Sequence, residues 1–240
     1  MIHTNNKRIA IVFDLDDTLI RTSEYSEYFV GQFFEFLERE GKVDKNFENF
    51  REEYFKSYSN SQHIIEVIRK IIKSKYEERI IEDKTSFVYR EIFLADMQKN
   101  LDLFEDIHYI LNQLNKYKIP IYLVSQGFED VQDLKIRSKN LHKYFPDNRI
   151  HITQNKSKYF YKQIKLLIEV TNHCDNIINV GDSEEKDIIN AKDADLITVR
   201  VKQGNKGNFN FEKSRATFKI NEVREIIEVI KNIQNQLNNK

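Results

Sequence analysis

Two patterns of apolar residues alternate along the chain. Short unbroken apolar runs, such as residues 9–13 and 177–180, are typical of strands buried on both faces of a parallel sheet. Between such runs, apolar residues recur at helical spacing, as from Tyr159 to Val170. Strands separated by helices favour parallel crossover connections, so the pattern predicts an α/β fold. Further strands are predicted at 120–124, 150–152, 196–201 and 217–220, and further helices at 107–117, 128–139, 184–194 and 222–237.

Residues 21–103 interrupt this alternation after the first strand. They contain no proline and many charges, and Phe29, Phe33 and Leu37 lie four residues apart, on one helix face. We expect four or five helices and little strand in this segment. The predicted organisation is therefore a core formed by residues 1–20 and 104–240, with an all-helical domain of residues 21–103 inserted into it.

Composition narrows the class of protein. The 240 residues are 40% hydrophobic and carry 38 basic and 38 acidic side chains, so the net charge is zero. This balance argues against nucleic-acid binding, because that function favours a basic surplus. No apolar run has the length of a membrane helix, and the polar start predicts no secretory signal. Cys174 is the single cysteine, so no intrachain disulfide can form, and we expect a cytoplasmic protein.

Three carboxylates follow the first predicted strand, at Asp14, Asp16 and Asp17. Like charges this close repel one another, and a bound divalent cation would remove that cost. Asp14 and Asp16 would point to the same side of an extended chain, so both can act at one site. The alternative is a solvated acidic turn in which Asp17 or Thr18 caps the next helix.

Polar residues also lie at the ends of two later strands and before one later helix. Gly181 and Asp182 follow the strand at 177–180, although Asp182 and Glu185 could instead form a capping box. Ser125 ends the strand at 120–124 and could present its hydroxyl to a phosphate, or lie in an ordinary turn. Lys156 and Lys158 precede a helix, where a lysine opposes the helix dipole. Ligands of open α/β sheets bind at the carboxyl edge, where these residues would meet.

In this order, the four motifs resemble those of the haloacid dehalogenase (HAD) superfamily of phosphohydrolases. The resemblance spans the whole chain, through Asp14-Leu15-Asp16-Asp17-Thr18, Ser125, a lysine, and Gly181-Asp182 with Asp187. The first and fourth motifs are specific, whereas the second and third are not. The resemblance implies a Rossmann-like parallel sheet, and the insert resembles the helical cap of the C1 members.

The resemblance also implies roles for individual residues. Asp14 would be the nucleophile that forms an aspartyl-phosphate, and Asp16 the general acid and base. Mg²⁺ would be held by Asp14, Asp182 and the backbone carbonyl of Asp16. Phosphate oxygens would bind Ser125 and the backbone N–H of Gln126, and the lysine would balance charge on the intermediate. Thr18 would support the first turn, and Asp187 would orient the lysine or a metal-bound water.

The lysine of the third motif is assigned by helix phase. In many relatives this lysine precedes apolar helix positions by six, nine and ten residues. Counted from Lys158, these offsets reach Ile164, Leu167 and Ile168, so we assign Lys158 rather than Lys156. Tyr159 stands where relatives commonly carry a proline.

The resemblance predicts a Mg²⁺-dependent phosphatase that hydrolyses a small phosphorylated metabolite. A phosphomutase or a phosphonatase of the same superfamily remains an alternative, as does a binding module without catalysis. The Asp14 and Asp16 pair disfavours the binding module, which needs no base beside a nucleophile. An aromatic-rich cap could also expose a surface through which the chain forms a homodimer.

Overall fold

The computed structural model describes residues 9–39, 94–204 and 210–238. The chain divides into two compact units, residues 1–23 with 102–240, and residues 24–101. In the second unit the described residues are helical: helix α1 (Thr22–Arg39) enters it, and residues 94–100 form another helix. Most of the predicted helical domain, at 40–93, lies outside the described residues, so its all-helical character stays a prediction.

The first unit is built on one parallel sheet of six strands, whose order is β3-β2-β1-β4-β5-β6. The strands are β1 (Ile9–Asp14), β2 (Ile121–Gln126), β3 (Ile150–Thr153), β4 (Asn176–Gly181), β5 (Ile197–Val201) and β6 (Phe218–Ile220). The predicted α/β class with a Rossmann-like parallel sheet is confirmed.

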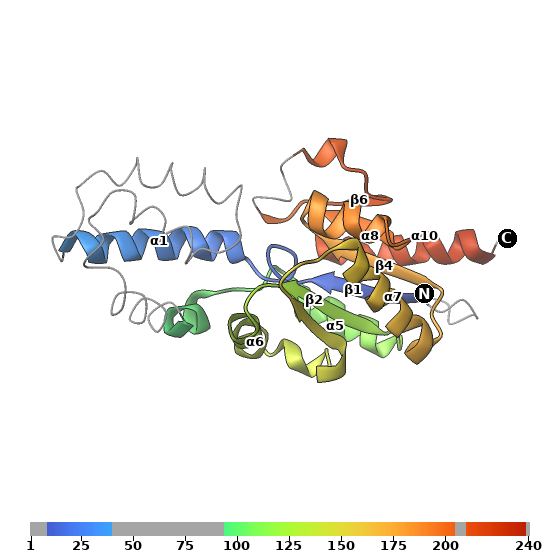
Figure 1. Cartoon of the computed structure of the whole chain (residues 1–240), viewed down its shortest axis with the longest axis horizontal. Coiled ribbons are helices and arrows are strands. Elements are labelled where there is room, and N and C mark those ends of the chain that lie inside the picture. The colour runs from blue at the N-terminus through green and yellow to red at the C-terminus, as the bar shows by residue number, and fades with distance from the viewer. Residues whose placement is uncertain (1–8, 40–93, 205–209, 239–240) are drawn as a thin grey trace. The chain divides into compact units, whose positions relative to one another are not determined.

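Helices connect the strands and cover both faces of the sheet (Figure 1). The α-helices are α5 (Ile107–Lys116), α6 (Glu129–Ser138), α7 (Lys158–Asn172), α8 (Asn190–Lys192) and α10 (Ile226–Asn238). Short 3₁₀ turns are η1 (Leu141–Lys143), η2 (Asp147–Arg149), η4 (Phe211–Lys213) and η5 (Val223–Glu225), and η3 (Glu184–Ile189) is a π-helical turn. Among the described residues, no helix combines the length and apolar character needed to cross a membrane.

Strand β1 lies in the middle of the sheet and is buried throughout. Successive side chains of a strand point to opposite faces, so Ala10 and Val12 share one face. They pack in a buried cluster with Tyr161, Ile164 and Ile168 of α7. On the other side of the sheet lie α5 and α10, and their apolar positions are buried too (Figure 1). Burial on both faces explains why the strand is an uninterrupted apolar run in the sequence.

The strand order reverses between β1 and β4, which are direct neighbours. In open α/β sheets, this switch point leaves a crevice at the carboxyl ends of the two strands, where ligands bind. The strands end at Asp14 and Gly181, and these are the positions at which two of the predicted motifs begin. The topology therefore brings the first and fourth motifs to one edge of the sheet.

The helix layer predicts a matched pair of stability changes. Leu111→Ala on α5 removes a side chain that is fully buried, whereas Leu166→Ala on α7 removes one that is 61% exposed. We expect the first to cost about 2–5 kcal/mol in the free energy of unfolding, and the second to stay within about 0.5 kcal/mol. Urea denaturation followed by circular dichroism measures both. Equal costs for the two variants would contradict the packing of α5 on the sheet.

Candidate active site

A tight turn follows β1, and it contains Asp16 and Asp17 of the first motif. The carbonyl of Leu15 accepts hydrogen bonds from the backbone N–H of Leu19 (2.9 Å) and of Ile20 (3.1 Å). Asp17 has a φ of 60°, in the left-handed region that aspartate tolerates better than most residues. Its carboxylate accepts hydrogen bonds from the backbone N–H (2.8 Å) and the hydroxyl of Ser23. The turn is therefore closed by the Leu15 carbonyl and by the left-handed backbone of Asp17.

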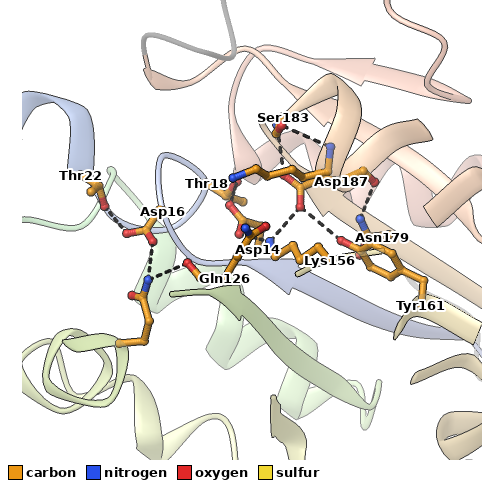
Figure 2. Close-up of polar contacts among 12 residues, drawn as sticks. Asp14, Asp16, Thr18, Thr22, Gln126, Lys156, Tyr161, Asn179, Ser183 and Asp187 are labelled. Atoms are coloured by element: carbon orange, nitrogen blue, oxygen red, sulfur yellow. Dashed lines mark hydrogen bonds and ion pairs between the residues drawn. The ribbon is translucent and has the colours of Figure 1, made fainter. Parts of the chain in front are cut away.

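Asp14 lies at the end of β1 with its side chain almost completely buried. One carboxylate oxygen accepts a hydrogen bond from the Thr18 hydroxyl at 2.9 Å, and the other forms an ion pair with Lys156 (Figure 2). The turn thus folds Thr18 back onto the aspartate that precedes it by four residues. One carboxylate oxygen of Asp14 is in this way held by a neighbour in sequence, and the other by a distant residue.

The lysine that reaches this site is Lys156, and the assignment of Lys158 is corrected. Lys156 Nζ contacts Asp14 and lies 2.8 Å from Oδ1 of Asp187, and its side chain is 3% exposed. Lys158 is the exposed first residue of α7. Ser157 is the N-cap, because its hydroxyl accepts from the backbone N–H of Phe160 at 3.3 Å. The phase argument failed because Lys156 precedes the helix, where the periodicity of the helix does not apply.

Asp187 is the second carboxylate that holds Lys156. Its Oδ1 also accepts a hydrogen bond from the Tyr161 hydroxyl (3.2 Å), and its Oδ2 accepts one from the backbone N–H of Ser183 (3.1 Å). A Cβ atom at Gly181 would lie 2.4 Å from Cβ of Asp187, closer than real Cβ contacts come. Only glycine at the end of β4 leaves room for this carboxylate beside the strand.

The fourth motif begins a π-helical turn, η3, of the kind often found at functional sites. Its N-cap is Ser183, whose hydroxyl accepts from the backbone N–H of Lys186 at 3.3 Å. The alternative in which Asp182 caps the helix is therefore wrong. Glu184 binds Arg200 of β5 through Oε2 (2.5 Å) and the backbone N–H of Arg215 through Oε1 (2.8 Å), which ties η3 to the sheet.

Three buried carboxylates gather where β1 and β4 end. Asp14, Asp182 and Asp187 each offer an oxygen, and the three oxygens lie within 4.8 Å of one another. Carboxylate oxygens are the ligands that hard divalent cations prefer, and a cation here would relieve the repulsion between them. The donor set therefore fits a Mg²⁺ ion. Asp16, expected among the metal residues through its backbone carbonyl, adds no carboxylate oxygen to this group.

Burial sets the protonation of the Asp14 cluster. Burial and the neighbouring carboxylates of Asp187 and Asp16 raise the pKa of the Asp14 carboxyl from 3.8 to about 7, against the attraction of Lys156. Burial opposes the charge of Lys156, but attraction from Asp14 and Asp187 dominates and raises the pKa of its ammonium well above 10.5. The lysine is therefore charged at neutral pH, while an Asp14 anion needs further positive charge nearby.

Asp16 has a separate set of partners. Its Oδ1 accepts from the Thr22 hydroxyl (2.5 Å) and from Lys135 Nζ (2.6 Å), and its Oδ2 accepts from Nε2 of Gln132 (2.9 Å). Burial opposes ionisation, but the Lys135 charge and these hydrogen bonds outweigh it and lower the pKa of Asp16 to about 2. We did not predict Lys135 or Gln132. Both lie in the helix after the second motif, and nothing in their spacing distinguishes them from core and surface residues.

The second motif lies at the end of β2. Ser125 is fully buried, and its hydroxyl has no hydrogen-bond partner among the described residues. A buried hydroxyl without a partner carries a free-energy cost that a ligand oxygen would remove, so this position suits a phosphate group. Gln126 ends the strand, and its carbonyl accepts from Nε2 of Gln132 at 3.1 Å.

Comparison with known proteins identifies the family. Residues 10–195, well over half of the chain, match the model of the haloacid dehalogenase-like hydrolases. The chain therefore belongs to this family. It is also 24% identical to glyceraldehyde 3-phosphate phosphatase from Methanocaldococcus jannaschii, over 94% of this chain and 98% of that protein. The predicted membership of the HAD superfamily of phosphohydrolases is confirmed.

Solved structures share the fold. YfnB from Bacillus subtilis, solved bound to magnesium, matches with a TM-score of 0.65 at 14% identity, over 94% of this chain and 100% of that one. A HAD family hydrolase from Deinococcus radiodurans, with bound phosphate and sodium, matches with a TM-score of 0.64 at 15% identity. That match covers 92% of this chain and 96% of the other. At identities this low, the two matches show a shared fold and nothing about activity.

The raised pKa of Asp14 predicts how stability changes with pH in metal-free protein. Between about pH 4 and pH 7, the folded chain holds a proton on Asp14 that the unfolded chain releases. Stability from this group therefore falls as pH rises through that window. Asp14→Asn cannot ionise, so in EDTA its melting temperature should exceed that of the wild type more at pH 8 than at pH 5.

Asp133→Asn, which removes a carboxyl group on α6 that is 45% exposed, is the control for this comparison. Thermal unfolding followed by circular dichroism provides the melting temperatures. A difference in melting temperature between Asp14→Asn and the wild type that is the same at pH 8 and pH 5 would contradict the raised pKa.

Proposed function

We propose that this protein is a Mg²⁺-dependent phosphatase that hydrolyses a small phosphorylated metabolite through an aspartyl-phosphate on Asp14. The observation that carries the proposal is the buried cluster in which Lys156 lies between Asp14 and Asp187, at the switch point of the sheet. A buried carboxylate is suited to attack on a phosphate group when it lies beside a fixed cation and a hydroxyl that has no partner among the described residues.

The reaction has two steps. In the first, a carboxylate oxygen of Asp14 bonds to phosphorus, the bond to the leaving oxygen breaks, and Asp16 gives its proton to that oxygen. In the second, Asp16 takes a proton from water as the water oxygen bonds to phosphorus. The bond between phosphorus and Asp14 then breaks, which releases inorganic phosphate and restores both carboxyl groups. The net reaction consumes one phosphomonoester and one water.

Asp16 needs its proton before the first step. Its low pKa means that the carboxylate is ionised before a substrate binds. An anionic phosphate beside it raises the pKa, because a like charge disfavours the ionised form. Bound substrate therefore raises the protonated fraction of Asp16, against the ion pair with Lys135 that favours the ionised form.

Asp14 and Asp182, with the backbone carbonyl of Asp16, would hold the Mg²⁺ ion. When bound, the ion supplies positive charge that lets an anionic carboxylate approach an anionic phosphate. The raised pKa of Asp14 supports this requirement, because the carboxyl needs added positive charge to be ionised at neutral pH. Asp187 is then left to orient Lys156 and the Tyr161 hydroxyl rather than to bind the ion first.

Lys156, Ser125 and Thr18 complete the phosphate site. Lys156 would balance the charge that develops on the phosphate oxygens, and the Ser125 hydroxyl would donate to one of them. Thr18 holds the Asp14 oxygen that does not contact the lysine, which orients the carboxylate for attack. The backbone N–H of Gln126 would add a further donor at the end of β2.

The substrate class rests on the relative and on charge. The Methanocaldococcus jannaschii relative is named for glyceraldehyde 3-phosphate, so small alkyl monophosphates are the first class to test. The balanced net charge disfavours nucleic-acid ends as substrates. We retain the proposal that residues 21–103 form a C1-type helical cap that selects the leaving group.

The direct test is phosphate release from a panel of small phosphomonoesters, with glyceraldehyde 3-phosphate and 4-nitrophenyl phosphate first. We expect turnover with Mg²⁺, none with EDTA, and none for Asp14→Asn. Binding is measured separately, as a rise in melting temperature when Mg²⁺ and beryllofluoride are added together. We expect this rise in the wild type and its loss in Asp182→Asn. The proposal would be overturned if the wild type showed no turnover and also no metal-dependent shift in melting temperature.

The position of the lysine predicts a difference between two variants. Lys156→Met removes the cation from the buried cluster, so kcat/KM should fall by about 10²–10³-fold, as for loss of a donor to developing charge. Lys158→Met changes an exposed side chain and should leave kcat/KM within about twofold. Steady-state kinetics on the best substrate measures both, and circular dichroism establishes that each variant is folded. A larger loss in Lys158→Met would return the catalytic role to that lysine.

A further inference from the structure

Helix α6 directs two polar side chains at Asp16. Gln132 and Lys135 lie three residues apart, so they share one face of the helix. Both are buried, with relative exposures of 3% and 6%. Gln132 Nε2 donates to Oδ2 of Asp16 at 2.9 Å, and Lys135 Nζ donates to Oδ1 at 2.6 Å. Each carboxylate oxygen of Asp16 therefore has a donor from α6.

A buried lysine needs a reason, because removing an ammonium group from water costs several kcal/mol unless a partner compensates. Among the described residues, Lys135 forms its ion pair with Asp16. Gln132 Nε2 also donates to the Gln126 carbonyl at 3.1 Å, which fixes the amide relative to the end of β2. The pair on α6 is thus anchored to the strand that carries the second motif.

We propose that Lys135 is a positioning residue for the phosphatase reaction, which holds the Asp16 carboxylate in a fixed orientation beside the nucleophile Asp14. This inference rests on the proposed function, in which Asp16 transfers the proton. Lys135 acts through Asp16 and does not touch the phosphate. A general acid or base works only when its oxygen is held within hydrogen-bond reach of the proton it transfers.

Substrates with different leaving groups distinguish a role of Lys135 in positioning Asp16 from a role in stabilising the fold. A poor leaving oxygen needs the proton of Asp16 in the first step, whereas a good one departs without it. The constant kcat/KM reports steps up to phosphoryl transfer, while kcat includes release of phosphate from Asp14. Aryl phosphates of similar shape, phenyl phosphate and 4-nitrophenyl phosphate, therefore differ in their need for Asp16 at the first step only.

The experiment measures both substrates with the full-length wild type and Lys135→Met in Mg²⁺. We expect kcat/KM on phenyl phosphate to fall by about 10²-fold, the lower end for loss of general acid catalysis. On 4-nitrophenyl phosphate, kcat/KM should fall several-fold less, while kcat falls because the second step still needs Asp16. Lys135→Arg keeps the positive charge, so its kcat/KM on phenyl phosphate should fall less than that of Lys135→Met. An equal fall in kcat/KM on both substrates would overturn the proposal.

A double-mutant cycle supplies the second criterion. In an Asp16→Asn background, Lys135→Met should lower kcat/KM by less than twofold, because the lysine acts through the carboxylate. Losses that multiply would overturn the proposal. The matched control is Arg137→Met, which removes an exposed cation from the same helix and should match the wild type on both substrates. If Lys135→Met does not fold, Lys135→Gln is carried through the same cycle. A wild type without turnover would instead contradict the proposed function.

Discussion

The site depends on one buried cation placed between two buried carboxylates. Lys156 lies between Asp14, at the end of β1, and Asp187, on η3, and water is nearly excluded from all three side chains. An ion removed from water costs several kcal/mol unless a partner compensates, so each of these charges needs the others. The two ion pairs therefore join segments that are remote in sequence, and they fix Asp14 at the switch point of the sheet.

The charges of this cluster do not balance. Asp14 and Asp187 face one lysine, and Asp182 adds a third carboxylate within 4.8 Å. Burial, and then the carboxylates of Asp187 and Asp16, raise the pKa of Asp14 against the attraction of Lys156. A divalent cation and a substrate phosphate change that balance in opposite directions. In the proposed function the two bind together, and each offsets the charge that the other brings.

Much of the fold could be predicted from the sequence, because strands such as β1 are buried on both faces and form unbroken apolar runs. The aspartates could be predicted because they end such strands. Lys156 was missed in favour of Lys158 because helical phase says nothing about residues before an N-cap. The ion pair of Lys135 with Asp16 joins residues 119 positions apart, so only the tertiary structure brings them together. Residues 40–93 lie outside the described structure, so the predicted cap there remains a prediction.

The surroundings of two aspartates separated by one residue shift their pKa values in opposite directions. Burial and neighbouring carboxylates raise the pKa of Asp14, whereas Lys135 and its companion donors lower the pKa of Asp16. A pair of carboxyl groups whose environments separate their pKa values is a mark of divided chemical roles. Asp17 follows the pair in a left-handed conformation, which the hydrogen bonds from Ser23 stabilise.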